Sequence, residues 1–179
     1  MGTELGDFDD LVRRYLAAFG PASVMDVQAW CGLTRLAEVL DRLRPTLVAF
    51  RDETGRELFD LPGAPRPEPD TPAPPRFLYD FENLLLSYAD RSRVVRPGLA
   101  RSITARTQES LSTFILDGLV SGLWAVQRER ARATLVLTPF RPLTADERRG
   151  LSDEGAGLLA FAAVDANERD IWFAGVSPP

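Results

Sequence analysis

The chain has 179 residues, of which 45% are hydrophobic and 26% charged, enough to bury one large core or two smaller ones. Its 21 basic residues are all arginine and face 26 acids, so the net charge of −5 excludes a strongly basic nucleic-acid-binding protein. Histidine and lysine are absent and Cys31 is the single cysteine, which excludes imidazole or lysine catalysis, an internal disulfide and a cysteine-based zinc site. We therefore expect no metal, no other cofactor and no membrane partner, and we predict a cytoplasmic protein.

The first part of the chain carries the pattern of consecutive short helices. Apolar side chains recur at helical spacing between Phe8 and Phe19, and Gly20-Pro21 ends this pattern. Ser23 and Asp26 have the spacing of a capping box, which predicts that a second helix begins there and stops at Gly32.

A third helix and a hairpin are predicted to follow. Thr34 can cap another amphipathic helix, and Pro45 bars its continuation. Residues 46–51 and 56–61 are strand-like runs around a turn that contains a glycine. Three helices followed by a hairpin is the order of a winged helix, which we predict for residues 7–61.

The third helix of a winged helix is the one that enters the major groove of DNA. Arg35 and Arg42, which face outward in this prediction, are therefore candidate DNA-binding residues. Acids on the same helix, together with Asp52 and Glu53 at the hairpin tip, would repel phosphates. Packing against another domain is the alternative role of this helix.

Residues 62–75 are unusually rich in proline and hold seven of the 14 prolines in the chain. Proline fixes φ and lacks an N–H group, so this stretch can join neither a helix interior nor a sheet. We predict an extended connector between two domains, with a ligand for a proline-binding domain as the alternative.

The remainder, residues 76–179, is predicted to be mainly β and to form a small barrel-like domain with one covering helix, which makes the chain α+β. The Asp117-Gly118 pair predicts a tight hairpin turn, and Thr144 with Glu147 forms a capping box that opens the covering helix. The other expected elements are a short helix within 82–89 and strands over 76–81, 112–116, 119–127, 133–137 and 171–173.

Arginines concentrate in residues 91–106, which we call the arginine segment. Five arginines there follow one acid, Asp90, so five positive charges minus one leave a net charge of +4. Guanidinium and hydroxyl donors suit phosphate oxygens, and Pro97-Gly98 favours a loop. We predict that this segment contacts the backbone of double-stranded DNA; the alternative is a solvated loop. The candidate residues are Arg91, Arg93, Arg96, Arg101 and Arg106.

A second basic group consists of Arg128, Arg130 and Arg132, which would share one face at strand spacing. A solvated hairpin end is the favoured interpretation of this group. Nothing in the sequence indicates catalysis, because serine and cysteine nucleophiles have no histidine to activate them. We therefore predict no catalytic residue.

Three strings of residues resemble a known family. They are LVRRYLAAFGPASVMDVQAWCGL at 11–33, PDTPAPPRFLYDFENLLLSYADRSRV at 69–94 and ILDGLVSGLW at 115–124. Together they resemble the AlkZ-type family of winged-helix DNA-binding proteins, which includes bacterial DNA glycosylases that excise alkylated bases and unhook interstrand crosslinks. The resemblance extends from about Asp7 to Ala163.

The resemblance implies tandem winged helices followed by a barrel-like β region, of which this chain resembles only the C-terminal half. The catalytic Gln-hydrophobic-Gln motif of the family lies in the other half, and Gln28, Gln108 and Gln127 stand alone here. Tyr88 replaces a common histidine, and LYDFEN at 78–83 departs from the usual LPEFDN. No catalytic residue is carried over. We expect either a truncated piece of a larger glycosylase-like protein or a natural short paralogue.

Three functional hypotheses remain. The first is a non-catalytic module that binds duplex DNA, and the second is a fragment of an active alkyl-base DNA glycosylase that needs the missing N-terminal half. The third is a protein-interaction module that docks another protein or a second copy. An exposed apolar patch around Tyr15 and Phe19 would favour the third hypothesis.

Overall fold

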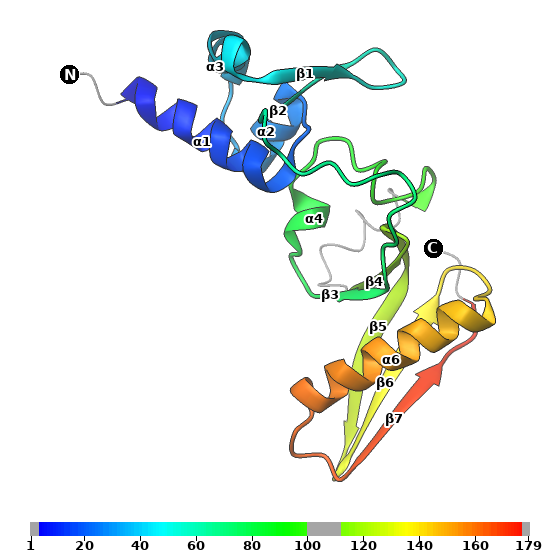
Figure 1. The fold of residues 1–179 in the computed structure, drawn as a ribbon. Helices are drawn as coiled ribbons and strands as arrows, with labels where there is room; N and C mark the ends of the chain where they lie inside the picture. The colour runs from blue at the N-terminus through cyan, green and yellow to red at the C-terminus, as the bar shows by residue number, and fades with distance from the viewer. Residues whose placement is uncertain (1–3, 100–111, 177–179) are drawn as a thin grey trace. The chain divides into compact units, whose positions relative to one another are not determined.

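The computed structural model describes residues 4–99 and 112–176 (Figure 1). The described chain is α+β and divides into two compact units. Unit 1 comprises residues 1–69 and 83–91, and unit 2 comprises residues 70–82 and 92–179. Each unit has its own hydrophobic core. In the part of the chain that is described, no helix is both long and apolar enough to span a bilayer.

Unit 1 contains short helices and a two-stranded hairpin (Figure 1). The elements are α1 (Glu4–Phe19), α2 (Val24–Cys31), α3 (Leu36–Leu43), the 3-10 turn η1 (Arg44–Thr46), β1 (Val48–Arg51), β2 (Glu57–Asp60) and α4 (Asn83–Leu86). β1 pairs with β2 in antiparallel register, with Ala49 opposite Phe59. The three helices and the hairpin follow one another in the predicted order.

The amphipathic patterns of these helices meet in one core. Val12 and Leu16 of α1, Val27 of α2 and Leu40 of α3 are fully buried. Burying a side chain of this size stabilises the fold by roughly 1.5–3 kcal/mol. The capping box predicted at the start of α2 is confirmed: the Ser23 hydroxyl accepts from the Asp26 amide at 3.3 Å.

The start of α3 differs from the prediction. The N-cap is Arg35 in the left-handed conformation, with φ 64°, and the cap predicted at Thr34 is wrong. The carboxamide oxygen of Gln28, on the preceding helix, accepts the Leu36 amide at 3.1 Å. Gln28 thereby satisfies a helix-terminal N–H that no residue of α3 itself can reach.

Unit 2 is a five-stranded sheet with one long helix. Its elements are β3 (Arg76–Leu78), β4 (Thr113–Leu116), β5 (Leu119–Glu129), β6 (Arg132–Pro139), α6 (Ala145–Ala162) and β7 (Glu168–Phe173). The strand order is β3-β4-β5-β6-β7, so β3 and β7 are the edges. Neighbours are antiparallel except β6 and β7, which run parallel because α6 connects them (Figure 1).

The core of unit 2 lies between the sheet and α6. Leu135 and Leu137 of β6 and Leu151 and Leu159 of α6 are almost fully buried. A Cβ atom at Gly155 would lie 2.7 Å from the Leu135 side chain, so the glycine lets the helix approach the sheet. The second predicted capping box is also confirmed, with Thr144 as N-cap of α6.

The strand predicted over 76–81 is too long. β3 ends at Leu78, and Phe81 has a positive φ of 58°, which no strand residue adopts. Tyr79 and Phe81 are consequently exposed, instead of sharing a buried face with Phe77. Residues 62–75 contain no helix or strand, as their proline content predicted.

Candidate nucleic-acid interface

A buried carboxylate in unit 1 fixes the backbone just before the arginine segment. Asp26 is 2% exposed, and one of its oxygens accepts the amides of Ala89 at 2.9 Å and Asp90 at 3.3 Å. Its other oxygen accepts the Ser23 amide at 2.8 Å and the Ser23 hydroxyl at 2.7 Å. One side chain thus caps α2 and holds residues 89 and 90, so the position of the Arg91 backbone follows from this contact.

Two tyrosine hydroxyl groups form hydrogen bonds that connect residues 87 and 88 with α1. The Tyr15 hydroxyl donates to the Ser87 carbonyl at 2.7 Å, and the Tyr88 hydroxyl donates to the Phe19 carbonyl at 2.9 Å. Tyr15 is 1% exposed and its ring packs against Phe19 and Trp30. The exposed patch around Tyr15 that would favour a protein-interaction module is therefore not found there.

In unit 2 the arginine segment continues with two buried valines. Val94 and Val95 are 7% and 2% exposed, and the Val94 carbonyl accepts the Val120 amide of β5 at 2.8 Å. Arg93 and Arg96, on either side of these valines, are exposed. Residues 91–98 contain no helix or strand, as Pro97-Gly98 indicated. The two arginine residues that flank the buried valines are therefore exposed.

The candidate DNA-binding arginines differ in their burial and in whether a described carboxylate binds them. Arg91 is half-buried, and no described carboxylate forms an ion pair with Arg91 or Arg96. Arg35 is exposed at the start of α3. Arg42 forms an ion pair with Asp9 of α1, which raises the pKa of its guanidinium. The candidates Arg101 and Arg106 lie outside the described residues.

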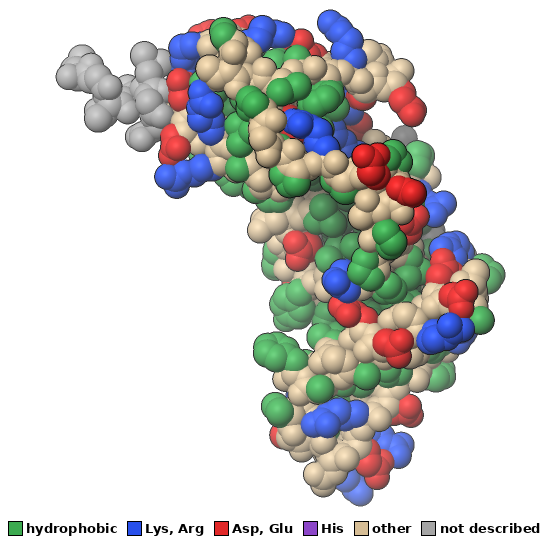
Figure 2. All heavy atoms as spheres, viewed as in Figure 1, with side chains coloured by type: hydrophobic (Ala, Val, Ile, Leu, Met, Phe, Trp, Pro, Cys, Tyr) green, Lys and Arg blue, Asp and Glu red, His purple; other side chains and the backbone are tan. Residues whose placement is uncertain are grey.

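Other arginines of unit 1 are also paired. Arg44 binds both carboxylate oxygens of Glu57, at 2.7 and 2.8 Å, and this hydrogen bonding lowers the Glu57 pKa. Arg56 bridges Asp52 at 2.9 Å and Asp90 at 2.8 Å. Figure 2 accordingly shows blue and red side chains interspersed over the helices of unit 1. Most of the positive charge around α3 is thus neutralised locally.

The second basic group is split between two strands and a turn. Arg128 of β5 pairs with Asp165 at 2.7 Å, and Arg132 of β6 pairs with Glu168 at 2.6 Å. Arg130 lies in the connecting turn with φ 53°, so the three side chains do not follow one strand. The favoured interpretation, a solvated hairpin end, fits these contacts.

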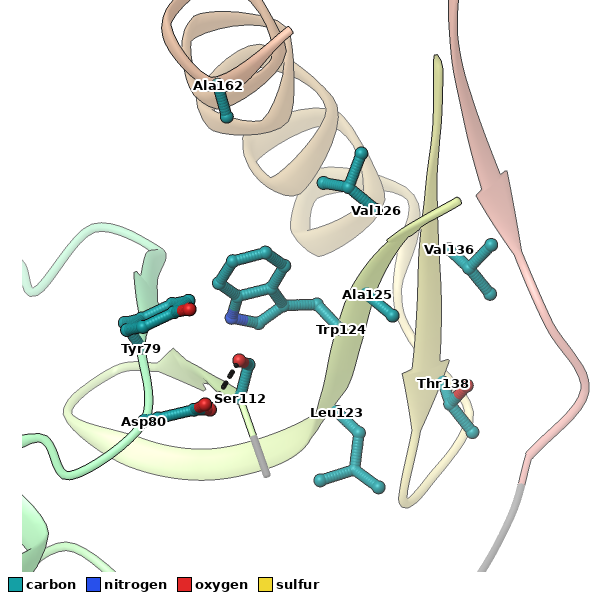
Figure 3. A pocket seen from close by; sticks show the side chains of 10 residues that line it. All are labelled: Tyr79, Asp80, Ser112, Leu123, Trp124, Ala125, Val126, Val136, Thr138 and Ala162. Atoms are coloured by element: carbon teal, nitrogen blue, oxygen red, sulfur yellow. Dashed lines mark hydrogen bonds between the residues drawn. The ribbon is translucent and has the colours of Figure 1, made fainter. Parts of the chain in front are cut away.

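Unit 2 also contains a hollow of about 600 Å³ that sequence reasoning missed (Figure 3). Tyr79 and Trp124 line it with rings 6.3 Å apart, and Asp80 and Ser112 line it beside them. The Ser112 hydroxyl donates to the Asp80 carboxylate at 3.0 Å. The aromatic alternation after Arg76 is the local signal at this place, and it predicts a strand face and not a hollow. Nothing local linked residue 79 to residue 124.

Within the described ranges, no group of three or more His, Cys, Asp or Glu side chains is arranged to hold a metal ion.

Comparison with known proteins supplies the family. The sequence profile of the family described as "DNA glycosylase AlkZ-like" matches residues 7–161. The chain belongs to the AlkZ-like DNA glycosylase family. No curated protein matches it significantly.

A solved structure of Streptomyces sahachiroi DNA glycosylase AlkZ has a similar fold, with a TM-score of 0.76 and 20% sequence identity. The match covers 97% of this chain and 47% of the AlkZ chain. This chain therefore spans about half the length of that AlkZ-like relative, and the similarity concerns the fold.

The AlkZ-like string at 69–94 has a clear structural role in this chain. Ser87, Tyr88, Ala89 and Asp90 are the residues that Tyr15, Phe19 and Asp26 hold. The motif that carries the family resemblance is thus the stretch that fixes the start of the arginine segment.

Proposed function

We propose that this chain is a DNA-binding module of the AlkZ-like family that contacts the duplex backbone and does not cleave glycosidic bonds by itself. In this proposal residues 7–61 act as a winged helix, 62–75 as a connector, and 76–179 as a barrel-like β domain. Arg91, Arg93, Arg96, Arg101 and Arg106 bind phosphates. Besides DNA, the proposed partner is an N-terminal half of the kind that AlkZ-like proteins carry, or another protein.

The observation that carries the proposal is that the arginines of this chain differ in whether a carboxylate binds them. The chain also belongs to a family of DNA glycosylases. Arg96 follows the buried Val95 and is exposed, and no described carboxylate pairs with it, whereas Arg42, Arg44 and Arg56 are bound to carboxylates. An exposed guanidinium held on a fixed backbone can form a bidentate contact with a phosphate without first breaking an ion pair.

The third helix has a smaller role in this proposal. Arg35 is exposed and can reach a phosphate, while Arg42 must leave Asp9 before it can do so. Glu38 and Asp41 on the same helix face solvent and repel the backbone. The arginine segment therefore contributes most of the affinity, largely without sequence preference.

The test is a mobility-shift titration of a duplex at two salt concentrations. With roughly four to six phosphate contacts, the slope of log affinity against log salt should be about −4 to −5. The triple variant Arg91→Ala/Arg93→Ala/Arg96→Ala should make that slope about three units shallower and weaken binding to all sequences alike.

A matched control changes three arginines that are already in ion pairs: Arg14→Ala/Arg132→Ala/Arg149→Ala. This variant has the same net charge as the first and should lose much less affinity. Absence of binding by the wild-type chain at low salt, or equal losses in both triple variants, would contradict the proposal.

The second candidate function is a part of an active alkyl-base DNA glycosylase. It is favoured by one observation, the match to only 47% of AlkZ. Incubating this chain alone with an alkylated duplex and assaying for abasic sites separates the two candidates. We expect no abasic sites, and their formation would show that the chain is catalytic without any further half.

A further inference from the structure

Asp26 of α2 holds the backbone that leads directly into Arg91. Its carboxylate is almost fully buried and accepts the amides of Ala89 at 2.9 Å and Asp90 at 3.3 Å. This stretch belongs to unit 1, as α2 does, so the contact lies inside one compact unit. A change at Asp26 therefore reaches Arg91 through a single residue of backbone.

Gln28 has the corresponding position at the start of α3. Its carboxamide oxygen accepts the Leu36 amide at 3.1 Å, and α3 has no side-chain cap of its own. Arg35 precedes Leu36 and has a positive φ of 64°, which a residue other than glycine keeps only when its surroundings enforce it. The bond between Leu36 and Gln28 is such a constraint, so it sets the direction in which the Arg35 side chain leaves the backbone.

Both constraints come from one helix. Asp26 and Gln28 are two positions apart on α2, and residues at that spacing point to different sides of a helix. The two backbone segments that they hold therefore lie on different sides of α2, which fixes them relative to each other. Arg35 is exposed and Arg91 half-buried, and no described carboxylate forms an ion pair with either of them.

We infer that Asp26 and Gln28 are positioning residues for DNA binding, and that α2 thereby sets the spacing of two phosphate contacts. Asp26 acts through Arg91. Gln28 acts through Arg35. This inference rests on the proposed binding of the duplex backbone. Two guanidinium groups with a preset spacing can meet two phosphates of a rigid duplex with little further loss of conformational freedom.

The experiment measures the slope of log affinity against log salt for a duplex in two double-variant cycles. Arg91→Ala removes one phosphate contact and should make the slope about one unit shallower. Asp26→Ala should also make the slope shallower, by up to about one unit, and should add nothing in the Arg91→Ala background. Gln28→Ala and Arg35→Ala should show the same pattern. A merely structural role of Asp26 would weaken every contact and would therefore add to the loss from Arg91→Ala.

Two variants at the same site serve as controls. Asp26→Asn makes the same charge change as Asp26→Ala, but its carboxamide oxygen can still accept the Ala89 and Asp90 amides, so the slope should stay close to that of the wild type. Ser23→Ala removes the hydroxyl that binds the other oxygen of Asp26 and should also leave the slope unchanged.

A third variant replaces Asp26→Ala if that protein does not fold. Ala89→Pro removes the N–H donor itself and leaves the bonds between Asp26 and Ser23 in place. It should make the slope shallower in the wild-type background and add nothing in the Arg91→Ala background.

The outcomes separate this inference from the function on which it rests. Additive losses in either cycle, or equal losses in Asp26→Asn and Asp26→Ala, would overturn the positioning role and leave backbone binding in place. An unchanged slope in Arg91→Ala or Arg35→Ala would overturn it as well. Failure of the wild-type chain to bind a duplex at low salt would overturn both.

Discussion

Each of the two units is stabilised internally by a different kind of interaction. In unit 1 two carboxylates, Asp26 and Asp60, are almost completely buried; Asp26 accepts the amides of Ala89 and Asp90, far along the chain, and Asp60 binds Arg66. In unit 2 the sheet and α6 are held mainly by apolar side chains, and Gly155 lets the helix lie close to Leu135 of the sheet. Polar contacts are directional and apolar contacts are not, so the same substitution type should have different effects in the two units.

The same difference extends to the arginines. Arg42 and Arg44 in and after α3 are bound to carboxylates, whereas Arg96 is exposed beside a buried valine and no described carboxylate pairs with it. The number of arginines in a stretch therefore does not reveal whether a phosphate can reach them. What matters is how many acids of other elements lie within reach, as Asp9 and Glu57 do in unit 1.

The largest effect is expected from the buried carboxylate of unit 1. Asp26→Ala leaves the Ser23, Ala89 and Asp90 amides without their acceptor and should lower the free energy of unfolding by about 3 kcal/mol. Urea denaturation measures the loss. Asp10→Ala, which removes only an exposed ion pair with Arg14, is the control and should cost less than about 0.5 kcal/mol. Equal losses would mean that the buried carboxylate does not organise unit 1.

A smaller effect on stability is expected where α6 lies close to the sheet of unit 2. The methyl group of Gly155→Ala would meet the buried Leu135 side chain, so we expect a loss of about 2 kcal/mol. Gly157→Ala places its methyl group in open space on the same helix and should stabilise the protein by about 0.5–1 kcal/mol, as alanine is the better helix former. Thermal unfolding distinguishes them, and the same sign in both would refute the packing argument.

Removing the carboxylates that bind arginines of unit 1 tests directly whether these ion pairs limit DNA binding. Asp9→Asn/Glu57→Gln removes the carboxylates that bind Arg42 and Arg44, and we expect about tenfold tighter binding to duplex DNA at low salt. Asp146→Asn/Glu168→Gln makes the same charge change next to Arg149 and Arg132. An equal gain from the second pair would show that overall charge, and not the surroundings of α3, limits binding.

The smallest effect is the pH dependence of stability that comes from Glu147 in unit 2. The Arg141 guanidinium lowers the pKa of Glu147 from 4.5 to about 2, so this carboxylate stabilises the fold above pH 4.5 and loses that contribution as the pH falls toward 2. In Arg141→Gln the Glu147 pKa should rise toward its ordinary value, and stability should depend less on pH in that window. NMR titration measures the Glu147 pKa, and urea denaturation at several pH values measures the stability; Asp52 of unit 1, whose pKa is also about 2, serves as the internal control and should not change.

The sequence by itself determined the local structure and the family. Helical spacing, two capping boxes, the Asp117-Gly118 turn and the proline-rich stretch each depend on residues a few positions apart, and the elements they predicted are present. The family resemblance, which comes from continuous strings of residues, is confirmed by the match over residues 7–161. Where a local rule failed, at Thr34 and beyond Leu78, a contact from another element or a left-handed residue replaced the expected pattern.

Only the tertiary structure decided which charged residues are paired with one another and which charged and aromatic residues are exposed. Asp9 lies 33 residues from Arg42, Asp26 lies 63 from Ala89, and Trp124 lies 46 from the Leu78 carbonyl that holds it. Such contacts arise when separately formed elements pack, and no spacing rule along a single chain encodes them. For this reason the sequence could locate the arginines, while the fold determined which of them are already bound and which remain exposed.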